Sequence, residues 1–229
     1  MADFRSRTAM LVGKEALDVL ASARVAIFGL GGVGGSAAEG LARAGGGSFI
    51  LIDGDEVSES NLNRQTVALR STLGLSKTEA MRRRILDINP DARVELVDRF
   101  ITPEDPLDML DRVDAVADAI DTVSVKLNIA KRCFDEGIPL VAAMGCGNRL
   151  HPEKLLLTDV FKTSGCGLCR VMRRELRKRN VTSLRVVAST EEAISPTECD
   201  EDPDRRSIPG SSPFVPSAAG LLMASEILD

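Results

Sequence analysis

Four glycines near the N-terminus have the spacing of a phosphate-binding loop. They follow the apolar run 24–28 and precede an Ala- and Leu-rich stretch at 36–44. Glycines between a strand and a helix let a phosphate approach the backbone, and the N–H groups at the helix start attract its negative charge. The four are Gly29, Gly31, Gly32 and Gly34. Asp53, at the end of the next apolar run, is placed to accept hydrogen bonds from a ribose. These residues predict a nucleotide site, which suits NAD as well as ATP.

Three charged residues favour ATP over NAD. Arg64 lies in a polar stretch after the second apolar run, Lys77 begins the next helical pattern, and Asp121 follows a further apolar run at 115–119. The two cations can neutralise the β- and γ-phosphates and the departing pyrophosphate, a task that hydride transfer does not have. A carboxylate at the same sheet edge suits Mg²⁺. The sequence therefore predicts ATP and magnesium, and an NAD-dependent oxidoreductase would leave all three residues without a role.

Alternating strand and helix patterns must position these residues. Predicted strands at 24–28, 48–53, 93–97, 115–119 and 139–143 alternate with predicted helices at 36–44, 77–89 and 123–136, after a first helix at 14–21. Such alternation predicts an α/β fold with a Rossmann-like, mostly parallel sheet and helices on both faces. Farther along we expect strands at 155–158 and 183–188, a basic helix at 168–179, an exposed and mobile loop at 189–213, and a last helix at 215–228.

Composition narrows the class of protein. Apolar residues make up 44% of the 229 residues, and the net charge of −5 argues against a protein coated with positive charge. We expect no membrane-spanning segment and no signal peptide. The odd number of cysteines, five, then predicts reduced thiols in a cytoplasmic protein.

The motifs resemble the adenylation motifs of the ThiF/MoeB/HesA superfamily, which is related to ubiquitin-activating enzymes. The resemblance rests on the glycine loop, Asp53-x-Asp55, 61–65 (which contains Asn61, Asn63, Arg64 and Gln65), Lys77 and Asp121. It implies that these residues bind ATP, that Arg64 orients the phosphates, and that Asp121 holds the metal. It also implies that Arg7 reaches into the site of a partner subunit, so that the protein is a homodimer with a single adenylation domain over 1–229.

Further segments resemble one group within this superfamily, the tRNA threonylcarbamoyladenosine dehydratases. They lie at 7–13, 144–149, 159–163, 171–176 and 212–220. The resemblance implies ATP-dependent activation of the threonyl carboxylate of the modified adenosine, followed by ring closure on the neighbouring carbamoyl nitrogen. Because that nitrogen is already held close, no external nucleophile is needed. Residues 1–145 would then form a nucleotide-binding half and residues 146–229 a half that faces the substrate.

A basic helix supplies charge for a tRNA partner. Its basic residues are Arg170, Arg173, Arg174, Arg177, Lys178 and Arg179. Contacts to phosphates would provide affinity without sequence specificity. The alternative interpretation is a solvated charged face, but the local excess of positive charge in an acidic protein favours tRNA.

Two cysteines support a competing hypothesis. Cys166-Gly-Leu-Cys169 lies where activators of sulfur-carrier proteins place the first of two zinc-binding pairs, but no second CxxC follows. We therefore expect free thiols more than zinc. The alternatives that remain are an adenylyltransferase acting on the C-terminus of a ubiquitin-like sulfur carrier, and a non-catalytic subunit that keeps the fold. Besides tRNA and a second copy of the chain, a sulfur-relay protein is a candidate partner.

Overall fold

One sheet organises the molecule. The computed structural model describes residues 3–195 and 209–229, and within them seven strands follow the order β3-β2-β1-β4-β5-β7-β6. Neighbouring strands pair in parallel except β6, which runs antiparallel to β7 at one edge. The strands are β1 Arg24–Phe28, β2 Ser48–Ile52, β3 Arg93–Val97, β4 Ala115–Asp118, β5 Leu140–Ala143, β6 Leu155–Asp159 and β7 Arg185–Ser189.

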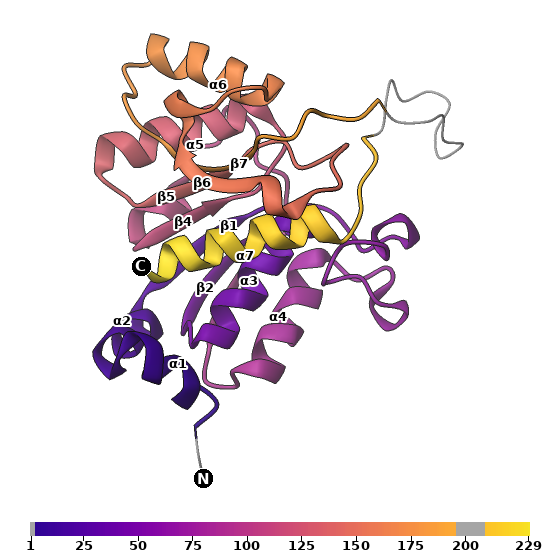
Figure 1. Cartoon of the computed structure of the whole chain (residues 1–229). Helices are drawn as coiled ribbons and strands as arrows, with labels where there is room; N and C mark the ends of the chain where they lie inside the picture. The colour runs from indigo at the N-terminus through magenta and orange to yellow at the C-terminus, as the bar shows by residue number, and fades with distance from the viewer. Residues whose placement is uncertain (1–2, 196–208) are drawn as a thin grey trace.

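Helices cover both faces of this sheet (Figure 1). One face carries α3, α4 and α7, and the opposite face carries α5 and α6. The helices are α1 Ser6–Val12, α2 Lys14–Ser22, α3 Gly32–Ala44, α4 Lys77–Ile88, α5 Val123–Glu136, α6 Gly167–Lys178 and α7 Phe214–Leu228. The α/β, Rossmann-like, mostly parallel fold expected from the sequence is therefore confirmed.

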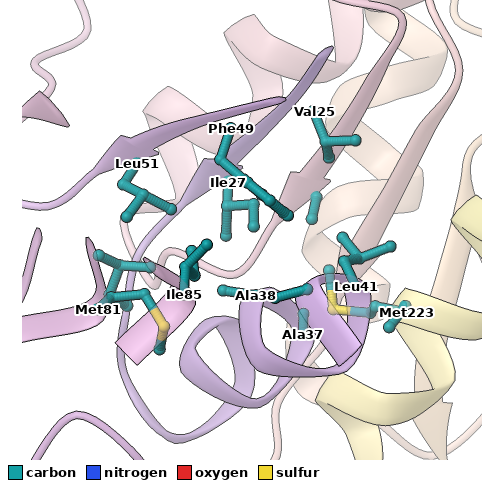
Figure 2. Close-up of a cluster of buried hydrophobic side chains, with 14 of the residues drawn as sticks. Val25, Ile27, Ala37, Ala38, Leu41, Phe49, Leu51, Met81, Ile85 and Met223 are labelled. Atoms are coloured by element: carbon teal, nitrogen blue, oxygen red, sulfur yellow. The ribbon is translucent and has the colours of Figure 1, made fainter. Parts of the chain in front are cut away.

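Alternate residues of the central strands supply the two cores. In β1, Val25 and Ile27 pack toward α3, whereas Ala26 and Phe28 face α5. Figure 2 shows the first of these cores, in which Ala38 and Leu41 of α3 lie beneath β1 and β2. Because both faces of each central strand are buried, the strands read as continuous apolar runs, as parallel sheets require.

The strand order creates the site. β1 and β4 are neighbours, with Phe28 opposite Asp118 in the register. From β1 the chain continues toward β2 on one side, and from β4 it continues toward β5 on the other. The loops that leave the carboxyl ends of these two strands therefore diverge, and at such a point ligands bind in open α/β sheets.

Most predicted elements form, with boundaries shifted by a few residues, but α1 was not predicted. No residue of α1 is buried, and Met10 and Leu11 are 84% and 87% exposed. The predicted loop 189–213 is corrected at its start, where Ser189 belongs to β7. Residues 196–208 of that loop lie outside the described residues. Among the helices described, none has the length and apolar character needed to cross a membrane.

Candidate nucleotide-binding site

The glycine loop is folded tightly onto the ends of β1 and β4. Gly29 has a φ of +83°, and a β-carbon there would lie 2.9 Å from the Ala119 carbonyl oxygen. A β-carbon at Gly34 would lie only 1.8 Å from the Gly29 carbonyl oxygen. These two glycines are therefore required by the packing of the loop itself, whatever ligand it binds.

Gly31 plays a different part. It is the N-cap residue of α3, and no side chain caps the helix there. Apart from its two chain neighbours, the nearest described atom to a β-carbon at Gly31 would be the Gln65 Nε2, at 4.0 Å. The start of α3 is thus open on this side, and its backbone N–H groups and positive dipole end suit a phosphate.

Asp53 braces this loop. Its Oδ2 accepts a hydrogen bond from the Leu30 amide at 2.6 Å, and its Oδ1 accepts one from the Asp55 amide at 2.8 Å. The carboxylate therefore links the end of β2 to the glycine loop, a contact that the sequence did not predict. Binding of a ribose at Asp53 stays a prediction.

The segment after β2 folds over the glycine loop and brings Arg64 to it. A β-carbon at Gly32 would lie 3.2 Å from the Arg64 carbonyl oxygen and 3.7 Å from its Cγ. The Arg64 Nη1 donates to the Ser60 carbonyl oxygen at 2.9 Å and to the Asn63 Oδ1 at 2.8 Å. Arg64 is thus held beside the start of α3 by its own segment, and its role in orienting phosphates stays a prediction.

Two amide side chains complete this segment. Asn61 is buried, and its Oδ1 accepts from the Ser58 amide at 3.1 Å, which stabilises a short turn at Glu59–Asn61. Gln65 is only 8% exposed, and its Oε1 has no hydrogen-bond partner among the described residues. A buried, unpaired acceptor beside Gly31 fits a site that a polar ligand completes.

Lys77 begins α4, whose N-cap Ser76 accepts from the Glu79 amide at 3.3 Å. Its Nζ donates to the Asp55 Oδ2 at 2.6 Å, and the lysine is buried whereas Asp55 is exposed. The structure therefore joins Lys77 to the segment after β2, the edge where the sequence placed it. Arg82 and Arg83, farther along α4, hold the pKa of Glu79 down to about 2 by hydrogen bonding.

Asp121 lies at the exposed turn between β4 and α5. Its Oδ1 is 3.5 Å from the Thr122 hydroxyl. Because β4 is adjacent to β1, this turn belongs to the same sheet edge as the glycine loop. An exposed carboxylate, a cation at Arg64 and an open helix start are the donor and acceptor types that ATP with Mg²⁺ requires, so the residues present fit that ligand.

Sequence reasoning missed a buried ion pair directly beneath this turn. Asp118 ends β4 and Lys126 lies in the first turns of α5, and the Nζ and Oδ2 atoms are 2.9 Å apart with both side chains inaccessible to solvent. Burial raises the pKa of Asp118, against the effect of the nearby lysine. The one available signal was a carboxylate inside an apolar strand, which seldom occurs without a partner.

Arg7 is not brought to the site of its own chain. Arg5, which directly precedes α1, lies at the far end of α3, because a β-carbon at Gly45 would lie 2.8 Å from the Arg5 Cδ. The helix α1 therefore begins at that end. Gly45 is the C-cap of α3, whereas the glycine loop is at its start. A helix of this length separates its ends by about 20 Å.

The basic helix forms as α6, on the face opposite α3. Glu175 pairs with Arg174, Lys178 and Arg179. The Arg173 guanidinium donates to the Thr163 carbonyl oxygen at 2.9 Å, so this residue is tied to the protein rather than presented to solvent. Arg170 is exposed, and the Arg177 guanidinium lies 5.1 Å from the centre of the Phe161 ring.

Cys166 and Cys169 are buried free thiols at the start of α6. Hydrogen bonding from the Cys169 thiol lowers the pKa of Cys166 to about 5, and the same contact raises the pKa of Cys169. Within the described residues, no group of three or more His, Cys, Asp or Glu side chains could hold a metal ion, so the zinc hypothesis gains no further ligand there. Cys199 lies outside the described residues.

Comparison with known proteins agrees with this geometry. The family model described as the ThiF family matches residues 5–229. The tRNA threonylcarbamoyladenosine dehydratase of Bacillus subtilis is 38% identical over 234 residues, which cover 97% of this chain and 92% of that protein. The crystal structure of Escherichia coli tRNA N6-threonylcarbamoyladenosine dehydratase in complex with AMP has a TM-score of 0.87 at 37% identity and covers 97% of this chain and 91% of that one. The structure of the same enzyme in complex with ATP has a TM-score of 0.87 at 36% identity and covers 97% and 90%. The chain belongs to the ThiF family.

Proposed function

We propose that this protein is an ATP-dependent tRNA threonylcarbamoyladenosine dehydratase. The observation that carries the proposal is the meeting of the glycine loop, Arg64 and Asp121 at the carboxyl ends of β1 and β4. It is supported by the similarity to enzymes of that name over nearly the whole chain. The similar enzyme from E. coli is known in complex with ATP and with AMP, the substrate and the product of an adenylation.

The chemistry assigned to the site is an acyl activation. The threonyl carboxylate oxygen attacks the α-phosphorus of ATP, a P–O bond forms, and pyrophosphate leaves. The carbamoyl nitrogen then attacks the activated carbonyl carbon, loses its proton, and AMP leaves with the former carboxylate oxygen. The net change is the loss of one water from the modified base, while ATP becomes AMP and pyrophosphate.

Each residue of the site has a task in this sequence. The N–H groups at the start of α3 bind phosphate oxygens, and Arg64 and Lys77 stabilise the negative charge that develops on the leaving pyrophosphate. For Lys77 this requires exchange of its Asp55 partner for a phosphate. Mg²⁺, held by Asp121, would supply further charge neutralisation. Asp53 keeps the glycine loop in place, and we assign the ribose to the same end of β2.

We assign the tRNA contact to α6 and the residues around it. The helix carries five basic residues and one acidic residue between Gly167 and Lys178. Its start is at the same edge as the site, because Gly145, which follows β5, lies beside Cys166: a β-carbon there would be 3.8 Å from the Cys166 Sγ. A phosphate backbone laid along this helix would therefore lead toward the carboxyl ends of β1 and β4.

We also infer a homodimer in which Arg7 acts in the site of the partner. The helix α1 has only seven residues and buries none of them. A helix this short is marginal in water unless another surface packs against it. The exposed Met10 and Leu11 supply an apolar face for a second copy of the chain, and the distance between α1 and the glycine loop explains why Arg7 would serve the other subunit. Because the proposed substrates of this protein are tRNA and ATP, we also propose that it acts in the cytoplasm.

Nucleoside analysis tests the activity directly. The protein is incubated with Mg-ATP and tRNA that carries threonylcarbamoyladenosine, and the digested tRNA is analysed by mass spectrometry. We expect conversion of the base to the form that lacks one water, with release of AMP and pyrophosphate. Unmodified tRNA is the control and should give no AMP. Formation of AMP only with a carrier protein that ends in Gly-Gly would instead identify a sulfur-carrier activator and overturn the proposal.

A further inference from the structure

The side chains of Asp118 and Lys126 form an ion pair in the core, where no solvent reaches either charge. Both side chains are 0% exposed, and the Nζ–Oδ2 distance is 2.9 Å. The same Nζ donates to the Asp118 carbonyl oxygen at 3.3 Å. The approach to Oδ2 is not aligned as a hydrogen bond, because Oδ2 has no such partner among the described residues. The contact is therefore mainly a Coulombic one between two desolvated charges.

Stability alone does not account for this pair. Removing both charges from water is costly, and apolar residues of similar volume at such positions are often neutral or stabilising. The neighbours of the pair are of the apolar kind: Phe28 and Ala142 flank Asp118 in the sheet, and Ile129 and Val125 of α5 are buried around Lys126. Leu in place of Asp118 and Met in place of Lys126 would serve a purely structural role equally well.

The pair instead fastens both ends of the turn that carries Asp121. On the strand side, the Ile120 amide donates to the Asp118 Oδ1 at 3.3 Å. On the helix side, α5 begins at Val123, directly after the turn, and the Lys126 amide makes the ordinary helical hydrogen bond to the Thr122 carbonyl oxygen at 3.0 Å. The Lys126 side chain therefore ties this helix start to Asp118. Ala119, at the start of the turn, is fixed to the neighbouring strand as well, because its amide donates to the Phe28 carbonyl oxygen at 2.8 Å. Only the tip of the turn, with Asp121, is left exposed.

We propose that Asp118 and Lys126 are positioning residues that hold the turn 119–122 so that the Asp121 carboxylate faces the phosphates across the sheet edge. The inference rests on the proposed function, in which Asp121 binds the Mg²⁺ of Mg-ATP. Neither residue touches ATP, metal or tRNA. The pair acts through the backbone. The Lys126 Nζ contacts both the carboxylate and the carbonyl oxygen of Asp118, the last residue of β4, and the helix that carries Lys126 begins at the other end of the turn.

The test removes both charges together, so that neither is left buried alone. The variant is Asp118→Leu/Lys126→Met, and the matched control is Lys131→Met/Asp135→Leu, which removes an exposed ion pair farther along α5. Urea unfolding shows whether each variant is folded. The first readout is amide hydrogen exchange of the peptide that covers 119–122, measured without nucleotide. The second is the Mg²⁺ concentration that half-saturates ATP–pyrophosphate exchange.

In the buried-pair variant we expect exchange at 119–122 to become at least about tenfold faster and the half-saturating Mg²⁺ concentration to rise about tenfold, since a loosened ligand binds its ion less well. Binding of ATP without Mg²⁺ and the exchange of β2 peptides should not change, and the control should match the wild type throughout. A folded variant with wild-type exchange at the turn and wild-type Mg²⁺ requirement would overturn the inference, as would exchange that rises equally over the whole chain.

Asp121→Ala in the same assay separates the two proposals. If Asp121→Ala raises the Mg²⁺ requirement but the buried-pair variant does not, the positioning role is wrong and the proposed metal role stands. If neither changes the requirement, the metal role of Asp121 is wrong, and a positioning role toward that metal is wrong with it.

Discussion

Replacing Gly31 or Gly34 by alanine should separate binding of the phosphates from folding of the loop. The two glycines are three residues apart, but the structure gives an added methyl group very different surroundings. At Gly31 the nearest protein atom would be 4.0 Å away, whereas at Gly34 the Gly29 carbonyl oxygen would be 1.8 Å away. Gly31→Ala should therefore fill only space that a ligand uses, and Gly34→Ala should disturb the protein itself.

The magnitudes follow from these distances. The backbone of Gly31, with φ −71° and ψ −156°, is open to an alanine, so the free energy of unfolding should change by less than about 1 kcal/mol. At Gly34 the new methyl carbon would lie about 1.2 Å closer to the Gly29 carbonyl oxygen than 3.0 Å, the distance below which β-carbon contacts are hardly ever found. Relieving that overlap requires backbone shifts at the ends of β1 and α3, which should cost about 3 kcal/mol or more.

For ATP affinity, in contrast to stability, Gly31→Ala should have the direct effect. A methyl group at Gly31 keeps the phosphates away from the N–H groups at the start of α3, so ATP affinity should fall at least about tenfold, or about 1.4 kcal/mol. Urea unfolding measures the first quantity and titration calorimetry the second. Gly167→Ala is the control, because no atom lies within 4 Å of a β-carbon there and it begins α6 on the opposite face. A folded Gly31→Ala protein with wild-type ATP affinity would refute the assignment of the phosphate site.

Alanine at Lys77 or at Asp121 should slow pyrophosphate release at least about a hundredfold, because each acts on charge that develops in the transition state; rapid-quench kinetics measures this rate, and lost ATP affinity with intact turnover would contradict it. An inactive Arg7→Ala chain mixed with an inactive Asp121→Ala chain should regain part of the activity, since one hybrid site is complete. Heterodimers that form without activity would show that Arg7 does not act in the partner. Arg170→Glu should weaken tRNA binding and flatten its log–log salt dependence by about one unit, whereas Arg112→Glu, at the opposite edge of the sheet, should change neither. Filter binding at several salt concentrations measures tRNA affinity for both variants. Equal losses for Arg170→Glu and Arg112→Glu would show that net charge, and not a contact at α6, accounts for the weaker binding.

Local patterns in the sequence determined the strands and helices that carry the site. Alternation of apolar runs with helical patterns predicted the parallel sheet, and the glycine spacing after β1 predicted a phosphate loop at its end. Arg64 and Lys77 follow β2, and Asp121 follows β4. These two strands flank β1 in the sheet, so the approximate location of the three residues could be derived from topology alone. The strands and helices could be predicted because each depends on residues that are close together in the chain, whereas phosphate binding by the loop stays a prediction.

Tertiary structure decided how each of these residues is held. The roles of Gly31 and Gly34 differ because one faces open space and the other meets the Gly29 carbonyl oxygen, a distinction that identical residue types cannot show. The ion pair between Asp118 and Lys126 joins a strand to a helix in the core. The position of Arg7 likewise depends on the contact between Arg5, just before α1, and Gly45 at the far end of α3. Contacts between elements depend on the order of the strands and on the space left between side chains, and neither is encoded in any short stretch of sequence.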